Sequence, residues 1–314
     1  MTDSRYVSGP ASLRAPDRPA AVPAPGAPRP QESAGPRHSL LRVFASHRLG
    51  LLGAGLIAAL AACCFLGPLL YHTDQLSANL QLTNLPPGSG HPLGTDDNGY
   101  DILGRLLVGG QSTLEIGLAV AAAATALGVA WGAVSGYTGG LADAVMMRVV
   151  DTGLAIPAIF LWIFLSSVLR PSVAVLIVVL SLLSWLGPAR LVRGEALSLR
   201  TRDFVLAARM MGGRRARIIA RHLVPNTVGT IVVSATFQVA DAIVLLATLS
   251  FLGFGLPPPA VTWGGMLSQG TTYLLDGYWW QVYPAGLAIT LTVIAFNLVG
   301  DALASTLDAR LWRR

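Results

Sequence analysis

The 314-residue chain contains no lysine, so its 22 lysine and arginine positions are all arginine. The phosphate-binding loop of P-loop ATPases needs a lysine that reaches the β- and γ-phosphates. Schiff-base catalysis needs a lysine amine as well. The chain therefore hydrolyses no ATP through a P-loop of its own, and lysine-based covalent catalysis is excluded.

Charge of either sign is scarce. Only 12% of the residues are charged and 53% are hydrophobic, with a mean hydropathy of +0.58. A soluble domain carries about a quarter charged residues. Here the charges lie between several long apolar runs, which is the pattern of a membrane protein.

Metal and redox sites have little support. The two cysteines, Cys63 and Cys64, are adjacent within one apolar run, and two thiols alone do not complete a zinc site. The five histidines show no metal-ligand spacing. We expect no metal or cofactor in this chain. The sequence pI of about 9.9 does not indicate nucleic-acid binding, because the arginines flank apolar runs and do not line a soluble face.

Six apolar segments predict an all-α membrane protein with six transmembrane helices. The predicted spans are residues 49–70, 114–137, 149–169, 173–187, 228–254 and 283–299. The predicted organisation is a disordered Pro/Ala/Arg-rich tail at 1–37, a first span with an extracytoplasmic segment at 38–112, a five-helix core at 113–305 and a C-terminal tail at 306–314. Pro157 predicts a kink in the third span. Gly128, Gly132 and Gly136 predict a stripe for close helix approach.

The arginine distribution predicts the orientation. Six spans place both termini on one side, together with the loops after spans two and four. That side collects nearly all the arginines, whereas the other holds only Arg105 and Arg170. The positive-inside rule makes the arginine-rich side cytoplasmic. We expect a multi-pass protein of the bacterial cell membrane.

The loop at 200–226 is the most basic of these segments. Asp203 is expected to be the N-cap of a short helix at 204–211, since its carboxylate can accept backbone N–H groups. Gly212 and Gly213 end that helix, and a second helix at 214–223 is expected to stop before Pro225. The apolar side chains of the first helix indicate a protein partner. A loop lying on anionic lipid is the other interpretation.

Several motifs resemble those of ABC-importer permeases of the dipeptide/oligopeptide (DppC/OppC) type. The loop residues Leu206-Ala207-Ala208, Gly212 and His222-Leu223-Val224-Pro225 resemble the "EAA" loop of that family, with Leu206 in place of its glutamate. The segment at 91–101 is similar to its "GTD…GRD" signature, with Tyr100 where an arginine is common. Further matches lie at 249–255, 263–264, 296–301 and 307–310.

The resemblance implies a type I ABC importer permease fold and a set of partners. These are a second homologous permease, two cytoplasmic ATP-binding subunits that hold ATP and Mg²⁺, and an extracytoplasmic substrate-binding protein, with membrane lipid around the helices. It also implies that the short loop helix couples to an ATPase. The coupling residues carried over are Asp203, Phe204, Val205, Leu206, Ala207, Ala208, Arg209, Met211 and Gly212.

Two acids lie inside predicted spans, where a charge is costly. Asp241 is a candidate for lining the translocation path, where a peptide ammonium would meet it, and pairing with the partner permease is the alternative. Asp151 is a weaker candidate for the same path. Trp263, Trp279 and Trp280 are expected at a membrane interface, and the acidic segment at 96–101 is expected to face the binding protein.

Alternatives remain for the cargo and the energy source. Relatives of this type move nickel, haem, glutathione or sugars as well as peptides. An ion-coupled secondary transporter would show inverted repeats with matched interrupted helices, and the two halves of the chain show no such symmetry. A membrane enzyme lacks support, since no catalytic constellation is visible.

Overall fold

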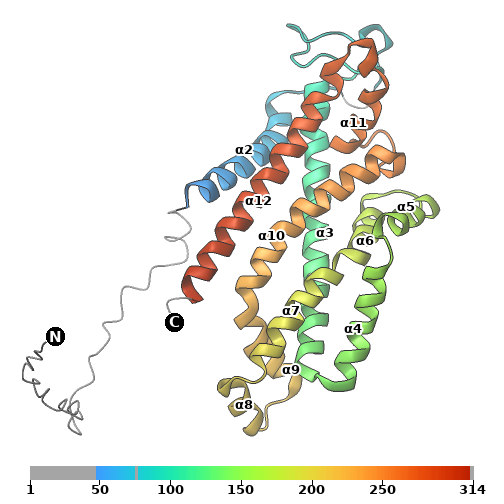
Figure 1. Cartoon of the computed structure of the whole chain (residues 1–314). Helices are drawn as coiled ribbons and strands as arrows, with labels where there is room; N and C mark the ends of the chain where they lie inside the picture. The colour runs from blue at the N-terminus through green and yellow to red at the C-terminus, as the bar shows by residue number, and fades with distance from the viewer. Residues whose placement is uncertain (1–46, 75–76, 312–314) are drawn as a thin grey trace, which may run out of the picture. The chain divides into compact units, whose positions relative to one another are not determined.

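A computed structural model describes residues 47–74 and 77–311, with side chains described up to residue 307. The described residues belong to one compact unit, which consists of helices and the loops that join them (Figure 1). The predicted tail at 1–37 lies outside the described residues. The first half holds α2 (Arg48–Leu70), η1 (Leu80–Leu82), α3 (Ile102–Thr138), α4 (Gly140–Ala155), α5 (Ala158–Val168), α6 (Val173–Ser184) and α7 (Leu186–Leu199). The second half holds α8 (Asp203–Met210), α9 (Arg215–Ile218), η2 (Ile219–Leu223), α10 (Val224–Leu249), η3 (Ser250–Phe254), α11 (Trp263–Thr272), η4 (Leu274–Asp276), η5 (Trp279–Gln281) and α12 (Tyr283–Leu311).

The predicted number of membrane spans agrees with the structure when each bent helix pair is counted as one span. Four helical segments are long and apolar enough to cross a bilayer. Two further spans come from α4 with α5, bent by 81°, and from α6 with α7, bent by 45°. The bend between α4 and α5 confirms the predicted kink at Pro157, which cannot donate a backbone hydrogen bond.

The second span begins earlier than predicted. Its helix, α3, starts at Ile102 and not at Leu114, because the Asp101 side chain caps the helix by accepting a 2.7 Å hydrogen bond from the Gly104 N–H. The sequence predicts no helix here because this segment contains the polar residues Arg105 and Gln111. Both side chains have partners within the fold, so a helix can contain them.

The third and fourth spans also extend further than predicted. The helix of the third span starts at Gly140, nine residues before the predicted start. The fourth span continues through Pro188 to Leu199, so the predicted end at residue 187 is wrong. Pro188 is the third residue of α7, where a missing N–H costs no intrahelical hydrogen bond.

The expected stop before Pro225 is wrong as well. A π-helical turn, η2, joins α9 to α10, and the Val224 N–H donates to the Ile219 carbonyl five residues earlier. A single continuous helical segment therefore covers Arg215–Phe254. Pro225 sits in the first turn of α10, where proline is tolerated.

The sixth span exceeds its predicted end at residue 299. The helix α12 continues to Leu311, so the predicted tail at 306–314 starts as helix. Residues 312–314 lie outside the described part of the chain.

The predicted glycine stripe is confirmed as the contact between α3 and α7. A Cβ atom added at Gly128 would lie 2.6 Å from the Pro188 Cβ, and one at Gly136 would lie 2.7 Å from the Ala196 Cβ. At Gly132 it would collide with the Ala189 carbonyl. The two backbones approach this closely only because these three positions carry no side chain.

We predict that Gly128→Ala lowers the free energy of unfolding by about 1–3 kcal/mol, since the new methyl group overpacks the contact with α7. The matched control is Gly194→Ala, a glycine of α7 with nothing within 4 Å of its added Cβ. Alanine should stabilise that helix by up to about 1 kcal/mol. Thermal unfolding of the detergent-solubilised protein measures both. Equal shifts of the two variants in the same direction would contradict the packing account.

Candidate functional site

The loop between α7 and α10 holds the candidate coupling helix, α8. The helix starts at Asp203, and its N-cap is Arg202, which makes no side-chain capping bond. The expectation that Asp203 caps α8 is therefore wrong. Asp203 instead lies in the first turn, where a carboxylate interacts favourably with the positive end of the helix dipole.

The end of α8 is defined by two hydrogen bonds from the glycine pair. The Gly212 N–H donates to the Arg209 carbonyl and the Gly213 N–H donates to the Ala208 carbonyl, both at 3.0 Å. This is the Schellman pattern, and Gly212 has the left-handed φ of +77° that it requires. The prediction that Gly212 and Gly213 end the helix is confirmed.

The apolar side chains of α8 divide between two faces. Val205 and Ala208 are buried in a cluster with Tyr137 at the end of α3 and with Ile218 and Leu223 of the following helix. The expectation that the apolar side chains of this helix face a protein partner is therefore wrong for Val205 and Ala208, which pack against the chain itself.

The outward face of α8 is apolar and open. Phe204 and Leu206 are each 41% exposed, Met210 is 89% exposed and Met211 is 81% exposed. Ala207 and Arg209 are exposed as well, and the Arg209 guanidinium lies 5.4 Å from the centre of the Tyr137 ring. The exposed side chains of Phe204, Leu206, Met210 and Met211 are called the α8 outer face below.

An ion pair joins α7 to α4 in the bundle that leads into α8. Arg193 of α7 donates two 2.7 Å hydrogen bonds to the two carboxylate oxygens of Asp143 in α4. Ser135 of α3 donates to the same carboxylate. The Arg200 guanidinium at the end of α7 lies against the turn between α3 and α4, and donates to the Gly136 carbonyl at 3.4 Å. Hydrogen bonds thus join α3, α4 and α7 to one another in the part of the chain that precedes α8.

The two acids proposed for the translocation path differ in their partners. Asp151 accepts a 2.5 Å hydrogen bond from Arg190, and both side chains are about half exposed. Asp241 is exposed on α10, and no hydrogen bond or ion pair within the described residues involves its carboxylate.

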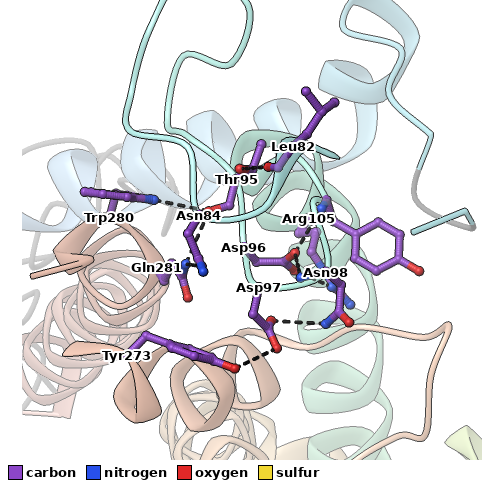
Figure 2. A network of polar contacts seen from close by, with 11 residues as sticks. Leu82, Asn84, Thr95, Asp96, Asp97, Asn98, Arg105, Tyr273, Trp280 and Gln281 are labelled. Carbon is purple, nitrogen blue, oxygen red and sulfur yellow. Dashed lines mark hydrogen bonds and ion pairs between the residues drawn. The ribbon is translucent and has the colours of Figure 1, made fainter. Parts of the chain in front are cut away.

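A polar network lies at the other end of α3, next to α11 (Figure 2). Arg105 donates a 2.6 Å hydrogen bond to Asp96, which also accepts from the backbone N–H groups of Asn98 and Tyr100 at 2.9 Å. The Asp96 and Arg105 side chains are only 6% and 7% exposed. A buried ion pair of this kind is tolerated when further hydrogen bonds satisfy the carboxylate.

The same network ties the segment before α3 to the segment before α12. The Thr95 carbonyl accepts from the Trp280 indole N–H at 3.2 Å and from the Gln281 amide at 3.3 Å. Gln281 also donates to Asn84 at 2.7 Å. At its edge the Tyr273 hydroxyl donates to Asp97 at 3.3 Å. Chain segments nearly 190 residues apart are therefore held together by hydrogen bonds.

Asp101 connects the network to the first span. Besides capping α3, its carboxylate accepts from the Tyr71 hydroxyl at 2.9 Å and lies 2.8 Å from Nδ1 of His91. Burial, reinforced by the hydrogen bond to Asp101, raises the pKa of Tyr71 to about 12. Asp96 and Asp101 are buried, so these two carboxylates are internal and are not themselves exposed to a binding protein.

Two of the three tryptophans are also internal. Trp263 is fully buried and its indole N–H donates to the Leu106 carbonyl at 2.8 Å. Trp280 is buried in the same apolar cluster. Neither ring is therefore an exposed interfacial anchor, because each indole N–H donates to a backbone carbonyl within the fold. Trp279 is half exposed.

Comparison with known proteins agrees with this architecture. Residues 128–313 match the family model described as the binding-protein-dependent transport system inner membrane component. Residues 35–87 match the N-terminal transmembrane domain of oligopeptide transport permease C. The chain belongs to this family of transport permeases. It is thus an inner-membrane component of a binding-protein-dependent ABC transport system.

Curated relatives cover most of the chain. The oligopeptide transport system permease protein OppC of Bacillus subtilis is 37% identical over 88% of this chain and 90% of its own length. The dipeptide transport system permease protein DppC of the same organism is 35% identical over 87% of this chain and 85% of its own length. A putative peptide transport system permease protein of Brucella abortus is 39% identical over 84% of this chain and 89% of its own length.

We predict that Asp96→Asn destabilises the permease by about 3–5 kcal/mol, because it leaves the Arg105 guanidinium buried without its counter-charge. The matched control is Asp97→Asn, one residue away, whose contact with Tyr273 is longer and partly exposed. It should change the melting temperature little. Thermal unfolding in detergent distinguishes them, and equal losses would show that the ion pair is not the stabilising element.

Proposed function

We propose that this permease forms half of the translocation pathway of an ATP-driven importer for dipeptides or oligopeptides. The family membership and the peptide-transport names of its relatives support this cargo. The arginine bias supports a cytoplasmic position for both termini and for α8. The chain itself would catalyse no reaction, since ATP and Mg²⁺ would be bound by separate subunits.

The proposed partners follow from this role. They are a second, homologous permease subunit, two cytoplasmic ATP-binding subunits and an extracytoplasmic substrate-binding protein. Within that assembly, residues 203–213 would form the contact with an ATP-binding subunit. Nickel, haem, glutathione or another small solute is the alternative cargo.

The exposure of the α8 outer face is the observation that supports the coupling role. Its apolar side chains are exposed on a helix whose opposite face is packed against α3 and the following helix. An exposed apolar patch on an anchored helix is typical of a docking surface. The buried face fixes the helix so that a partner can act on it as a rigid element.

The continuous helical segment from α9 to η3 offers a path for that action. It covers Arg215–Phe254, which is about 60 Å at 1.5 Å per residue. One end follows α8 directly, and the other leads to α11 (Figure 1). Closure of the ATP-binding subunits would move α8, and this segment would carry the displacement across the membrane.

The energy source can be tested in proteoliposomes that contain the purified permease complex and its binding protein. We expect peptide uptake to require ATP inside the compartment that faces α8 and to survive collapse of the proton gradient. Uptake that stops with the proton gradient and ignores ATP would favour an ion-coupled carrier instead.

For docking, we predict that Met210→Arg weakens retention of the ATP-binding subunits about tenfold, because truncating or charging a central contact typically costs more than 1 kcal/mol. An arginine at the C-terminal end suits the helix dipole, so α8 itself should persist. The control is Ala216→Arg, which adds the same charge on exposed α9. Copurification measures retention. Unchanged retention with Met210→Arg would remove α8 as the docking element.

For Asp241 we propose a place in the translocation path, where its carboxylate would attract the peptide ammonium. Asp241→Asn should raise the KM for peptides with a free N-terminus about tenfold or more, since hydrogen bonds to charged groups contribute about 1.5–3 kcal/mol. Peptides with an acetylated N-terminus are the control and should be unaffected. If both peptides lose uptake equally, Asp241 pairs with the partner permease and does not contact substrate.

A further inference from the structure

An open pocket of about 420 Å³ lies between α4 and α7. It is lined by Ala144, Met147, Arg148, Asp151, Arg190 and Arg193. Neither the family resemblance nor the proposed coupling helix accounts for it. Three guanidinium groups around one cavity are unusual in helices that cross a membrane, where each charge is costly unless it is paired.

The charges of the pocket do not balance among the residues that the structure describes. Arg193 is bound by Asp143, which lies behind the pocket, and Arg190 is bound by Asp151. Arg148 is exposed, and no ion pair within the described residues involves it. Three positive charges therefore meet two negative charges, which leaves one positive charge at the mouth of the pocket without a counter-ion.

The pocket lies at a depth that suits a lipid headgroup. Arg148 is eight residues from the start of α4 and Arg190 is nine residues from the end of α7. At 1.5 Å per residue, both lie about 12–14 Å from the end of the bundle that carries α8. Long arginine side chains at such positions reach the polar boundary of the bilayer.

The surface beside the pocket is apolar. Leu141, Val145 and Val149 follow one another at four-residue spacing on α4 and are all exposed. This spacing places them on one side of the helix, next to Arg148. A ligand with an anionic head and hydrocarbon chains would satisfy the unpaired guanidinium and cover this apolar stripe together.

We propose that the pocket binds the phosphate group of an anionic phospholipid, with Arg148 as its main contact and Arg190 as a second. Arg193 holds the pocket wall through Asp143. Asp151 opposes the anion and sets its affinity. Basic pockets between transmembrane helices on the cytoplasmic side bind anionic headgroups in this way.

The test is a titration of the purified complex in detergent with phosphatidylglycerol, followed by native mass spectrometry of the bound lipid. Arg148→Gln should raise the half-saturating concentration about fivefold, the effect of one basic residue at an anionic surface. Asp151→Asn should lower it, because the opposing carboxylate is neutralised. Opposite shifts of these two variants exclude a general loss of folding as the cause.

Three controls define the ligand. Arg170→Gln removes an exposed arginine outside the pocket and should leave the titration unchanged. Phosphatidylcholine should bind more weakly than phosphatidylglycerol. An unchanged titration with Arg148→Gln would overturn the proposal, and so would equal binding of the two lipids. Displacement by excess inorganic phosphate alone would also overturn it, since the site would then recognise a free anion and not a lipid.

Discussion

The close approach of α3 to α7 is the constraint on which the rest of the structure depends. Three glycines allow the two backbones to touch, and the Asp143–Arg193 ion pair holds α4 against the same surface. Because α7 leads directly into α8, the position of the loop that carries α8 depends on this contact. Side chains at the glycine positions would separate the helices and move α8 with them.

The same helix, α3, also organises the opposite end of the bundle. Asp101 caps its N-terminus and accepts a hydrogen bond from Tyr71, while Arg105, one turn into the helix, holds the buried Asp96. The signature segment at 91–101 thus acts in this chain mainly as an internal tie. Its acids Asp96 and Asp101 are satisfied by backbone N–H groups, a hydroxyl and a guanidinium, which is why these two can be buried.

Apolar run length and glycine spacing were sufficient to predict six spans and the α3–α7 contact, because both follow from local sequence. The sequence does not predict the start of α3, because Arg105 is charged and its pairing with Asp96 is known only from the tertiary fold. Pro188 and Pro225 were read as helix ends, although proline in a first turn or after a π-helical turn breaks nothing.

The sequence likewise does not predict which apolar side chains of α8 are buried and which are exposed. Four apolar side chains on one short helix are equally compatible with a partner and with the chain's own core, and Tyr137, which decides the matter for Val205 and Ala208, is about 70 residues away. Packing locks one face of α8 to α3, α9 and η2, so the helix cannot rotate independently of its support. A force applied to the α8 outer face would consequently act on α3 and on the helix that continues into α10, and would not be absorbed by rotation of the loop.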